Sequence, residues 1–162
     1  MTKRAFHFAS FVLVVLLLAL ASCTQQRSPC YEPKLVNVAL GTFRMVDTTS
    51  VDTSLPYPTF ACVDTPLMQQ PGSTNNFSAL LSPFIDSTRW YLAPDSFTTV
   101  EQIDTITFYH SKELNFISNA CGYVYYYTLN SVKTTYHSID SISLINSSVD
   151  NNASTQHIKI YY

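Results

Sequence analysis

Hydrophobic and polar residues alternate with a period of two along most of the chain, which is typical of β-strands with one buried face. Within the segment from Lys34 to Phe43, Val36, Val38 and Leu40 alternate with small or polar residues. The same pattern predicts further strands over 59–63, 77–81, 88–92, 104–109, 113–118, 122–129, 141–146 and 156–162. Because such a count is slightly too generous, we expect about seven to nine strands.

Turn-forming residues separate these segments. They are Pro56, Pro58, Pro66, Pro71-Gly72, Pro83, Pro94 and the asparagine-rich stretch 146–152. Short strands between turns, with no helical stretch, favour an antiparallel arrangement over βαβ units. The expected fold class is therefore all-β, an antiparallel β-sandwich, with a small β-barrel as the alternative. The segment from Met68 to Ser78 has the weakest strand pattern and is predicted to be a long loop.

The first segment has the pattern of a targeting signal. Lys3 and Arg4 precede an unbroken apolar stretch over 11–20, the arrangement of a secretory signal peptide. A membrane-spanning helix needs about 20 apolar residues. The stretch 5–21 supplies 17 residues, and two of them are His and Ser. A retained transmembrane anchor is therefore the weaker interpretation.

Two cleavage sites compete at the end of this segment. Ala19-Leu20-Ala21 fits the A-x-A pattern of soluble secretion. Leu20-Ala21-Ser22-Cys23 resembles a bacterial lipobox, in which the cysteine is acylated and the chain is cut just before it. We favour the lipobox because it is the more specific motif, and two or more acyl chains suffice for stable anchoring. The prediction is a signal peptide over 1–22, lipidation of Cys23, a tether over 23–33 and one domain over 34–162.

The residues after Cys23 indicate a location. No Asp follows Cys23 to resemble an inner-membrane retention signal, and no acidic run resembles a surface-export signal. We therefore expect a lipid-anchored protein on the periplasmic face of the bacterial outer membrane.

Composition supports strands and narrows the expected partners. Aromatic residues make up 14% of the chain and charged residues 12%, the latter about half the usual share. A chain rich in β-branched and aromatic residues and poor in helix formers favours strands. The formal net charge of -2 gives no basic surface for phosphates. We expect no nucleic-acid partner, and instead the membrane and an envelope protein or glycan.

The sequence lacks the usual motifs for catalysis and metal binding. Its three glycines, Gly41, Gly72 and Gly122, are far apart, which excludes phosphate loops and G-x-S-x-G elbows. No metal-ligand spacing involves His110, His137 or His157, so each is expected on a strand face or turn with an ordinary hydrogen bond. We expect no enzyme activity, cofactor or metal; an envelope hydrolase using two carboxylates is the alternative.

An apolar residue followed by Asp and then Thr or Ser recurs along the chain, with its aspartates at 47, 52, 64, 86, 104 and 140. Such Asp residues commonly form turns by accepting a hydrogen bond from the backbone two residues on. In turns, water would leave their pKa values unperturbed, unlike those of catalytic acids. The triplets at 47, 86, 104 and 140 also resemble an O-glycosylation sequon of some lipoprotein-rich bacteria, so glycosylation remains an alternative role.

A run of tyrosines is the most conspicuous side-chain cluster. On a strand, Tyr123, Tyr125 and Tyr127 would lie on one face. An exposed row of Tyr could stack on a sugar or a partner protein, whereas cross-strand packing is its ordinary structural role. We favour packing and retain this row as a candidate binding face. The expected function is a non-catalytic binding or structural module of the envelope, with a sugar-binding protein as a further alternative.

Several motifs together resemble a known family. They are the lipobox, Cys30 followed by Pro33 and a strand, Asp104-Thr105-Ile106-Thr107-Phe108-Tyr109, Ala120-Cys121-Gly122-Tyr123 and His157-Ile158-Lys159-Ile160-Tyr161. This set resembles a group of small bacterial lipoproteins classed as a domain of unknown function. Cys62 and Asn119 depart from the pattern. The resemblance implies a cellular location and a fold, and it implies no activity.

If Cys23 is lipidated, three thiols remain, and an exported protein favours one bridge with one thiol left over. Three pairings are open. Cys62 lies in an apolar strand and suits a buried free thiol, whereas Cys30 precedes the first strand and Cys121 lies at a turn. The family resemblance points to the same two residues. We therefore expect a disulfide between Cys30 and Cys121, with Cys62 reduced.

Overall fold

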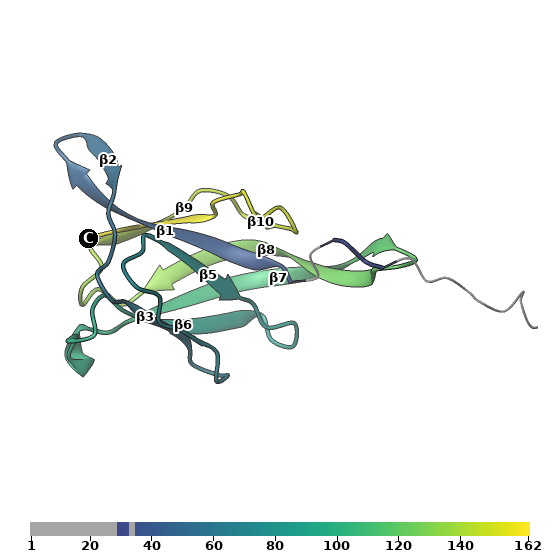
Figure 1. The fold of residues 1–162 in the computed structure, drawn as a ribbon, viewed down its shortest axis with the longest axis horizontal. Helices are drawn as coiled ribbons and strands as arrows, with labels where there is room; N and C mark the ends of the chain where they lie inside the picture. The colour runs from purple at the N-terminus through teal and green to yellow at the C-terminus, as the bar shows by residue number, and fades with distance from the viewer. Residues whose placement is uncertain (1–28, 33–34) are drawn as a thin grey trace, which may run out of the picture. The chain divides into compact units, whose positions relative to one another are not determined.

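Eleven β-strands and one short 3-10 helix, η1 (Val100–Gln102), make up the secondary structure of the residues that this computed structural model describes, 29–32 and 35–162 (Figure 1). The chain divides into two units, Met1–Cys30 and Tyr31–Tyr162, and all the strands belong to the second. The all-β fold class predicted from the sequence is confirmed. Within the described residues, no helix has the length and apolarity needed to cross a membrane.

The first sheet is built around one long strand, β1. Its five strands are β1 (Asn37–Val46), β2 (Thr49–Asp52), β5 (Asn76–Leu80), β9 (Ser141–Leu144) and β11 (Ile158–Tyr161). One edge of β1 pairs first with β5 and then with β2, and the other edge pairs with β11, which in turn pairs with β9.

The pairing of β1 with β11 is parallel, with Leu40 opposite Ile158 and Thr42 opposite Ile160. The sequence predicted an antiparallel sandwich, and this one parallel pair departs from that prediction. Parallel strands need a long crossover between them. Here the crossover is almost the entire domain, because the two strands lie at opposite ends of its sequence. A pattern confined to each strand gives no information about such a pairing.

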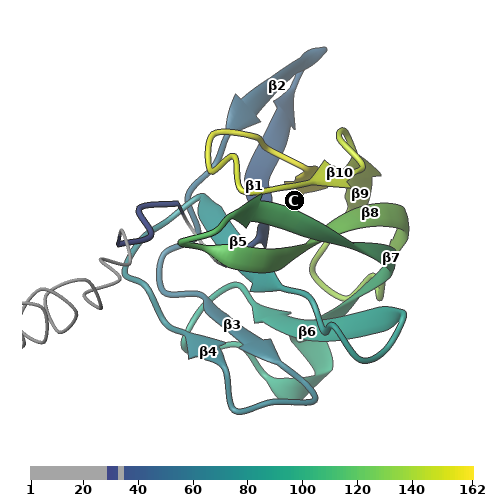
Figure 2. The ribbon, with the colours of Figure 1, turned by 90° about the vertical axis from the view of Figure 1, so that its right-hand side faces the viewer.

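The second sheet is antiparallel throughout. In order across the sheet, its six strands are β10 (Ser148–Val149), β8 (Gly122–Thr134), β7 (Asp104–Ser118), β6 (Ser87–Ala93), β3 (Thr59–Cys62) and β4 (Met68–Gln69). In Figure 2, β1 and β2 of the first sheet lie apart from β3, β4 and β6 of the second.

Alternating side chains from both sheets meet in one hydrophobic core. The Phe60 ring stacks on Trp90 with ring centroids 4.5 Å apart, and it contacts Phe77 of the other sheet at 5.4 Å. The indole N–H of Trp90 donates to the carbonyl of Leu80 at 3.1 Å. Burying the Trp ring therefore leaves no unpaired donor, which would otherwise cost about 1–3 kcal/mol. This aromatic cluster joins the two sheets.

The observed strands exceed the predicted number of about seven to nine. The two segments predicted at 104–109 and 113–118 form one strand, β7. Its middle is exposed, so the alternation of apolar and polar residues is interrupted there. Three strands were not predicted, namely β2, β4 and β10. β2 is almost fully exposed, and the other two have two residues each, so none offers a period to read. β4 and the start of β5 lie in the segment predicted to be a long loop.

The β7–β8 hairpin is the longest pairing of the structure. Its register runs from Ile106 opposite Thr134 to Ser118 opposite Gly122, with a shift beside His110. Gly122 has φ 75°, a backbone conformation that glycine adopts without the steric cost of a side chain. The hydroxyl of Ser118 accepts the N–H of Cys121 at 3.0 Å. Figure 1 shows this hairpin extending past the ends of β5 and β6.

Candidate functional site

The predicted signal peptide, its cleavage site and the lipidation residue Cys23 lie outside the described residues. Of the predicted tether over 23–33, only residues 29–32 are described. The lipid anchor therefore stays a prediction from the sequence.

The cysteines differ in their chemical state. Cys30 and Cys121 are disulfide-bonded, whereas Cys62 is a buried free thiol. The two bonded residues are those that the sequence predicted to pair, and the expectation that Cys62 stays reduced is confirmed. Cys62 faces the core from β3, as its place in an apolar strand indicated.

The three tyrosines of the candidate binding face differ sharply in burial. Tyr123 is 64% exposed and Tyr125 38%, but Tyr127 is only 7% exposed. Tyr127 donates its hydroxyl proton to the carbonyl of Leu81 at 3.4 Å, and its ring meets the ring of His110 edge-on with centroids 5.3 Å apart. Tyr127 is therefore a core residue, which corrects the prediction of a three-tyrosine face. The contact with Leu81 shows that the loop after β5 lies against Tyr127.

Two residues of β7 complete the exposed part of this face. Phe116 lies opposite Tyr123 and Leu114 opposite Tyr125 in the hairpin register. Their side chains are 55% and 53% exposed, and the rings of Phe116 and Tyr123 are 5.2 Å apart. We call these four side chains, Leu114, Phe116, Tyr123 and Tyr125, the hairpin face. Sequence reasoning missed the β7 pair, although cross-strand partners in a tight hairpin always share a face.

The opposite side of the hairpin is covered. Val124 is buried, and Tyr126 donates its hydroxyl proton to Asn151 Oδ1 at 3.0 Å. The amide of Asn151 donates in turn to Glu32 Oε2 at 3.4 Å. The segment through which the chain enters the domain therefore lies on the side of the hairpin opposite to the hairpin face.

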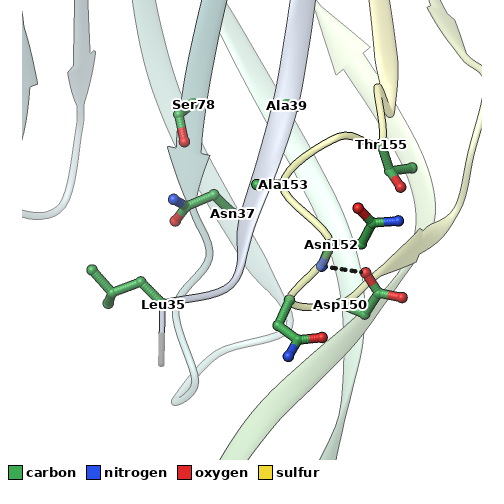
Figure 3. A pocket seen from close by; sticks show the side chains of 9 residues that line it. Leu35, Asn37, Ala39, Ser78, Asp150, Asn152, Ala153 and Thr155 are labelled. Carbon is green, nitrogen blue, oxygen red and sulfur yellow. Dashed lines mark hydrogen bonds between the residues drawn. The ribbon is translucent and has the colours of Figure 1, made fainter. Parts of the chain in front are cut away.

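A small polar pocket lies between β1 and the loop before β11 (Figure 3). It has a volume of about 190 Å³ and is lined by Leu35, Asn37, Ala39, Ser78, Asp150, Asn151, Asn152, Ala153 and Thr155. Asp150 Oδ1 accepts the N–H of Asn152 at 2.8 Å, and Asn37 Oδ1 is buried with no hydrogen-bond partner among the described residues. Pockets for drug-sized ligands typically have about 300–1,000 Å³. This one can admit at most a small hydrogen-bonding group.

The two buried histidines hold structural positions. His157 is 1% exposed: its Nδ1 accepts the N–H of Ala39 at 3.0 Å, and its Nε2–H donates to the carbonyl of Ser148 at 3.1 Å. His110 is 2% exposed and its Nε2 shares a 3.0 Å hydrogen bond with Thr88. Burial lowers the pKa of both imidazoles, so both favour the neutral form. The prediction of an ordinary hydrogen bond is confirmed for both.

Asp104 is a fully buried carboxylate, which corrects the expectation of a water-exposed turn residue. Five donors surround it at 2.7–2.9 Å, namely Thr135 Oγ1, Ser138 Oγ and the backbone N–H groups of His137, Ser138 and Ile139. Burial acts to raise the pKa of Asp104, but these hydrogen bonds outweigh it and the pKa is lowered. The carboxylate fixes the 135–139 turn against the start of β7. With its neighbourhood filled, it has no room to accept a proton from a substrate.

No cluster of three or more His, Cys, Asp or Glu side chains suited to a metal ion occurs in residues 29–32 and 35–162.

One family model matches residues 59–162, which is more than half of the chain. It describes a family of unknown function, DUF6452. The chain belongs to the DUF6452 family. No curated protein and no solved structure matches the chain.

The DUF6452 match confirms one part of the resemblance found in the sequence, namely membership of a family of unknown function. The match begins with the first residue of β3 and ends with the last residue of the chain. It thus includes the hairpin face, Asp104 and both buried histidines, and it leaves out β1 and β2. The lipoprotein character expected from the resemblance is a separate matter, because the matched segment starts well after Cys23.

Proposed function

We propose that this DUF6452 protein is a lipid-anchored component of the bacterial outer membrane, on its periplasmic face, and that it acts by binding or as a structural module. The observation that carries the proposal is the hairpin face, in which four large apolar side chains project from one end of the domain. Exposed apolar surfaces of this kind mark sites of association with proteins or membranes. The lipobox motif ending at Cys23 supports the location.

The use of the titratable groups supports binding over catalysis. Asp104, His110 and His157 are buried, and each is bonded to a backbone or hydroxyl group that it holds in place. Catalytic acids and bases instead converge on a pocket that a substrate can enter. The perturbed pKa values of these residues follow from their structural roles.

An envelope hydrolase is the competing hypothesis. Its best support is a cavity of about 420 Å³ whose wall includes Cys62 and Thr88, since Thr88 also bonds to His110. A thiol nucleophile such as Cys62 would need a base within hydrogen-bonding reach. The imidazole of His110 instead shares its hydrogen bond with the Thr88 hydroxyl. Sugar binding is the second alternative, with the pocket of Figure 3 as its site, and the small size of that pocket limits it to one hydrogen-bonding group of a sugar.

The anchor is tested by replacing the acylated residue. Cys23→Ala should abolish incorporation of a labelled fatty acid and move the protein from the membrane to the soluble fraction, because the thioether to the lipid cannot form. Cys62→Ala is the matched control, since it removes a buried thiol and should keep both label and location. Unchanged labelling and fractionation of the Cys23→Ala protein would disprove lipidation. A pull-down with the anchored protein from native envelopes then identifies what it binds.

A further inference from the structure

The outer part of the β7–β8 hairpin carries no charged residue. The segment from Leu114 to Tyr127, which forms the outer half of the β7–β8 hairpin, contains no Asp, Glu, Lys, Arg or His. Two charged residues of β7 adjoin this segment: the exposed Glu113 directly precedes Leu114, and Lys112 lies at the base of the face opposite Tyr127, where its ammonium donates to the carbonyl of Pro83. The hairpin from Leu114 onward can therefore enter an apolar environment without desolvating a charge, which is the largest cost of leaving water, while Asp86, Lys112 and Glu113 stay at the base of the face.

A second apolar segment lies beside the base of the hairpin face. It is the loop between β5 and β6, in which Phe84 is 89% exposed and Ile85 47%. The loop is held to the hairpin by the bonds of Lys112 to Pro83 and of Tyr127 to Leu81. Two apolar segments thus occupy the same end of the domain, and Tyr123 and Tyr125 belong to a residue type that is enriched where membrane meets water.

The path of the chain brings this end close to the proposed anchor. Glu32 contacts Asn151, which contacts Tyr126 on the covered side of the same hairpin. Cys23 precedes Tyr31 by eight residues, and eight extended residues reach at most about 29 Å. A lipid on Cys23 therefore keeps Tyr31 within that distance of the bilayer, whatever the conformation of the tether.

We infer that the hairpin face inserts into the interfacial layer of the membrane that holds the lipid anchor, and so fixes the orientation of the domain on the bilayer. The inference rests on the proposed lipidation of Cys23. The tether alone would let the domain rotate freely. Contact through Leu114, Phe116, Tyr123 and Tyr125 orients it with the hairpin turn toward the bilayer and with η1, at the far end of β7, away from it. A strand of 15 residues separates these two ends by about 45 Å.

The experiment places a reporter at each end. Phe116→Trp puts an indole on the hairpin face, and Phe97→Trp is the matched control near η1, where the native ring is 88% exposed. Both proteins are purified in lipidated form and reconstituted in phosphatidylethanolamine–phosphatidylglycerol vesicles with and without brominated phospholipid. The native Trp90 is 1% exposed, so the wild-type protein gives a constant background and reports that the fold is intact.

In brominated vesicles, the indole added by Phe116→Trp should lose roughly half of its fluorescence, as expected of an indole at the interface. The fluorescence of Phe97→Trp should be the same in vesicles with and without bromine. Equal quenching at both positions, or none at 116, would overturn the inference. Tyr123→Trp repeats the test should the first variant not fold. Fatty-acid labelling of the same preparations reports on the anchor separately, so labelled protein without quenching refutes membrane contact alone. A concentration-dependent blue shift of the 116 emission without vesicles would instead assign the face to a second copy of the chain.

Discussion

At the scale of single residues, a buried polar group stabilises the fold at a position where the sequence pattern predicted an exposed turn residue. Asp104 belongs to a recurring turn motif, and its counterpart Asp140 is exposed, as that motif predicts. Asp104 itself is buried because the chain returns at 135–139 and supplies donors to both of its oxygens. Those donors lie more than 30 positions away in sequence, so no local pattern could have revealed them.

Replacing Asp104 tests this role. Asp104→Asn should lower the free energy of unfolding by about 3 kcal/mol, because an amide NH₂ would face donors that now lack an acceptor, at about 1–3 kcal/mol each. Urea denaturation at pH 7 measures the change. Asp140→Asn, at an exposed position of the same motif, should change it by less than about 0.5 kcal/mol. Equal stabilities of the two variants would show that the buried carboxylate contributes nothing specific.

At the scale of elements, the alternating pattern located strands well where one face is buried against the core. β3, β6 and β11 lie within a few residues of their predicted positions, because Phe60, Trp90 and Ile160 fill the core from them. The pattern also put Tyr123, Tyr125 and Tyr127 on one face correctly. It could not predict that Tyr127 is buried while Tyr123 and Tyr125 are more exposed, because the burial of Tyr127 depends on its contacts with Leu81 and His110, which lie far away in sequence or on another strand. Exposure is a property of the packed elements, and alternation reports only the direction of side chains.

His157 shows how one side chain connects several elements. It precedes β11, accepts a hydrogen bond from Ala39 in β1 and donates one to Ser148 in β10. Since β1 and β10 belong to different sheets, its neutral ring joins the two sheets of the sandwich. Burial lowers its pKa, while the Ser148 carbonyl and the charge of Asp150 act to raise it. Protonating Nδ1 would replace an acceptor by a donor facing the Ala39 N–H.

This arrangement predicts loss of stability in mild acid. Because the folded-state pKa of His157 lies below the ordinary 6.5, its contribution is complete above pH 6.5 and is lost as pH falls toward the folded-state pKa, by up to about 1.4 kcal/mol per pH unit. His110, which faces Asp86 and Lys112, adds a dependence of the same sign. Urea midpoints between pH 7.5 and about 5.5, which is more than one unit above the ordinary Asp and Glu pKa values of about 3.9 and 4.3, should show this slope. His157→Gln, which can keep both hydrogen bonds, should reduce it, and the exposed His137→Gln should not. Parallel profiles for wild type and His157→Gln would contradict the assignment.

At the scale of the whole molecule, the cysteines link the proposed anchor to the domain. Cys30 is seven positions after Cys23, and both Cys30 and Cys121 are disulfide-bonded while Cys62 is free. Cys121 lies at the turn of the hairpin that carries the hairpin face. A covalent constraint at this turn holds the end of the hairpin in shape. The predicted pairing therefore bears on both the stability of the domain and its proposed approach to the membrane.

A bridge between Cys30 and Cys121 would close a loop of about 91 residues, which the chain-entropy model values at roughly 4–5 kcal/mol, an upper figure for real bridges. Domains typically have a net stability of about 5–15 kcal/mol, so Cys121→Ser should lower the urea midpoint markedly, and a reducing agent should do the same to the wild-type protein. Cys62→Ala keeps the bridge and should lose only the packing of a small buried side chain, about 1 kcal/mol. Mass mapping of non-reduced peptides should find Cys30 joined to Cys121 and Cys62 free. A linked peptide that contains Cys62, or a wild-type midpoint that reduction leaves unchanged, would show that the bridge does not constrain this fold.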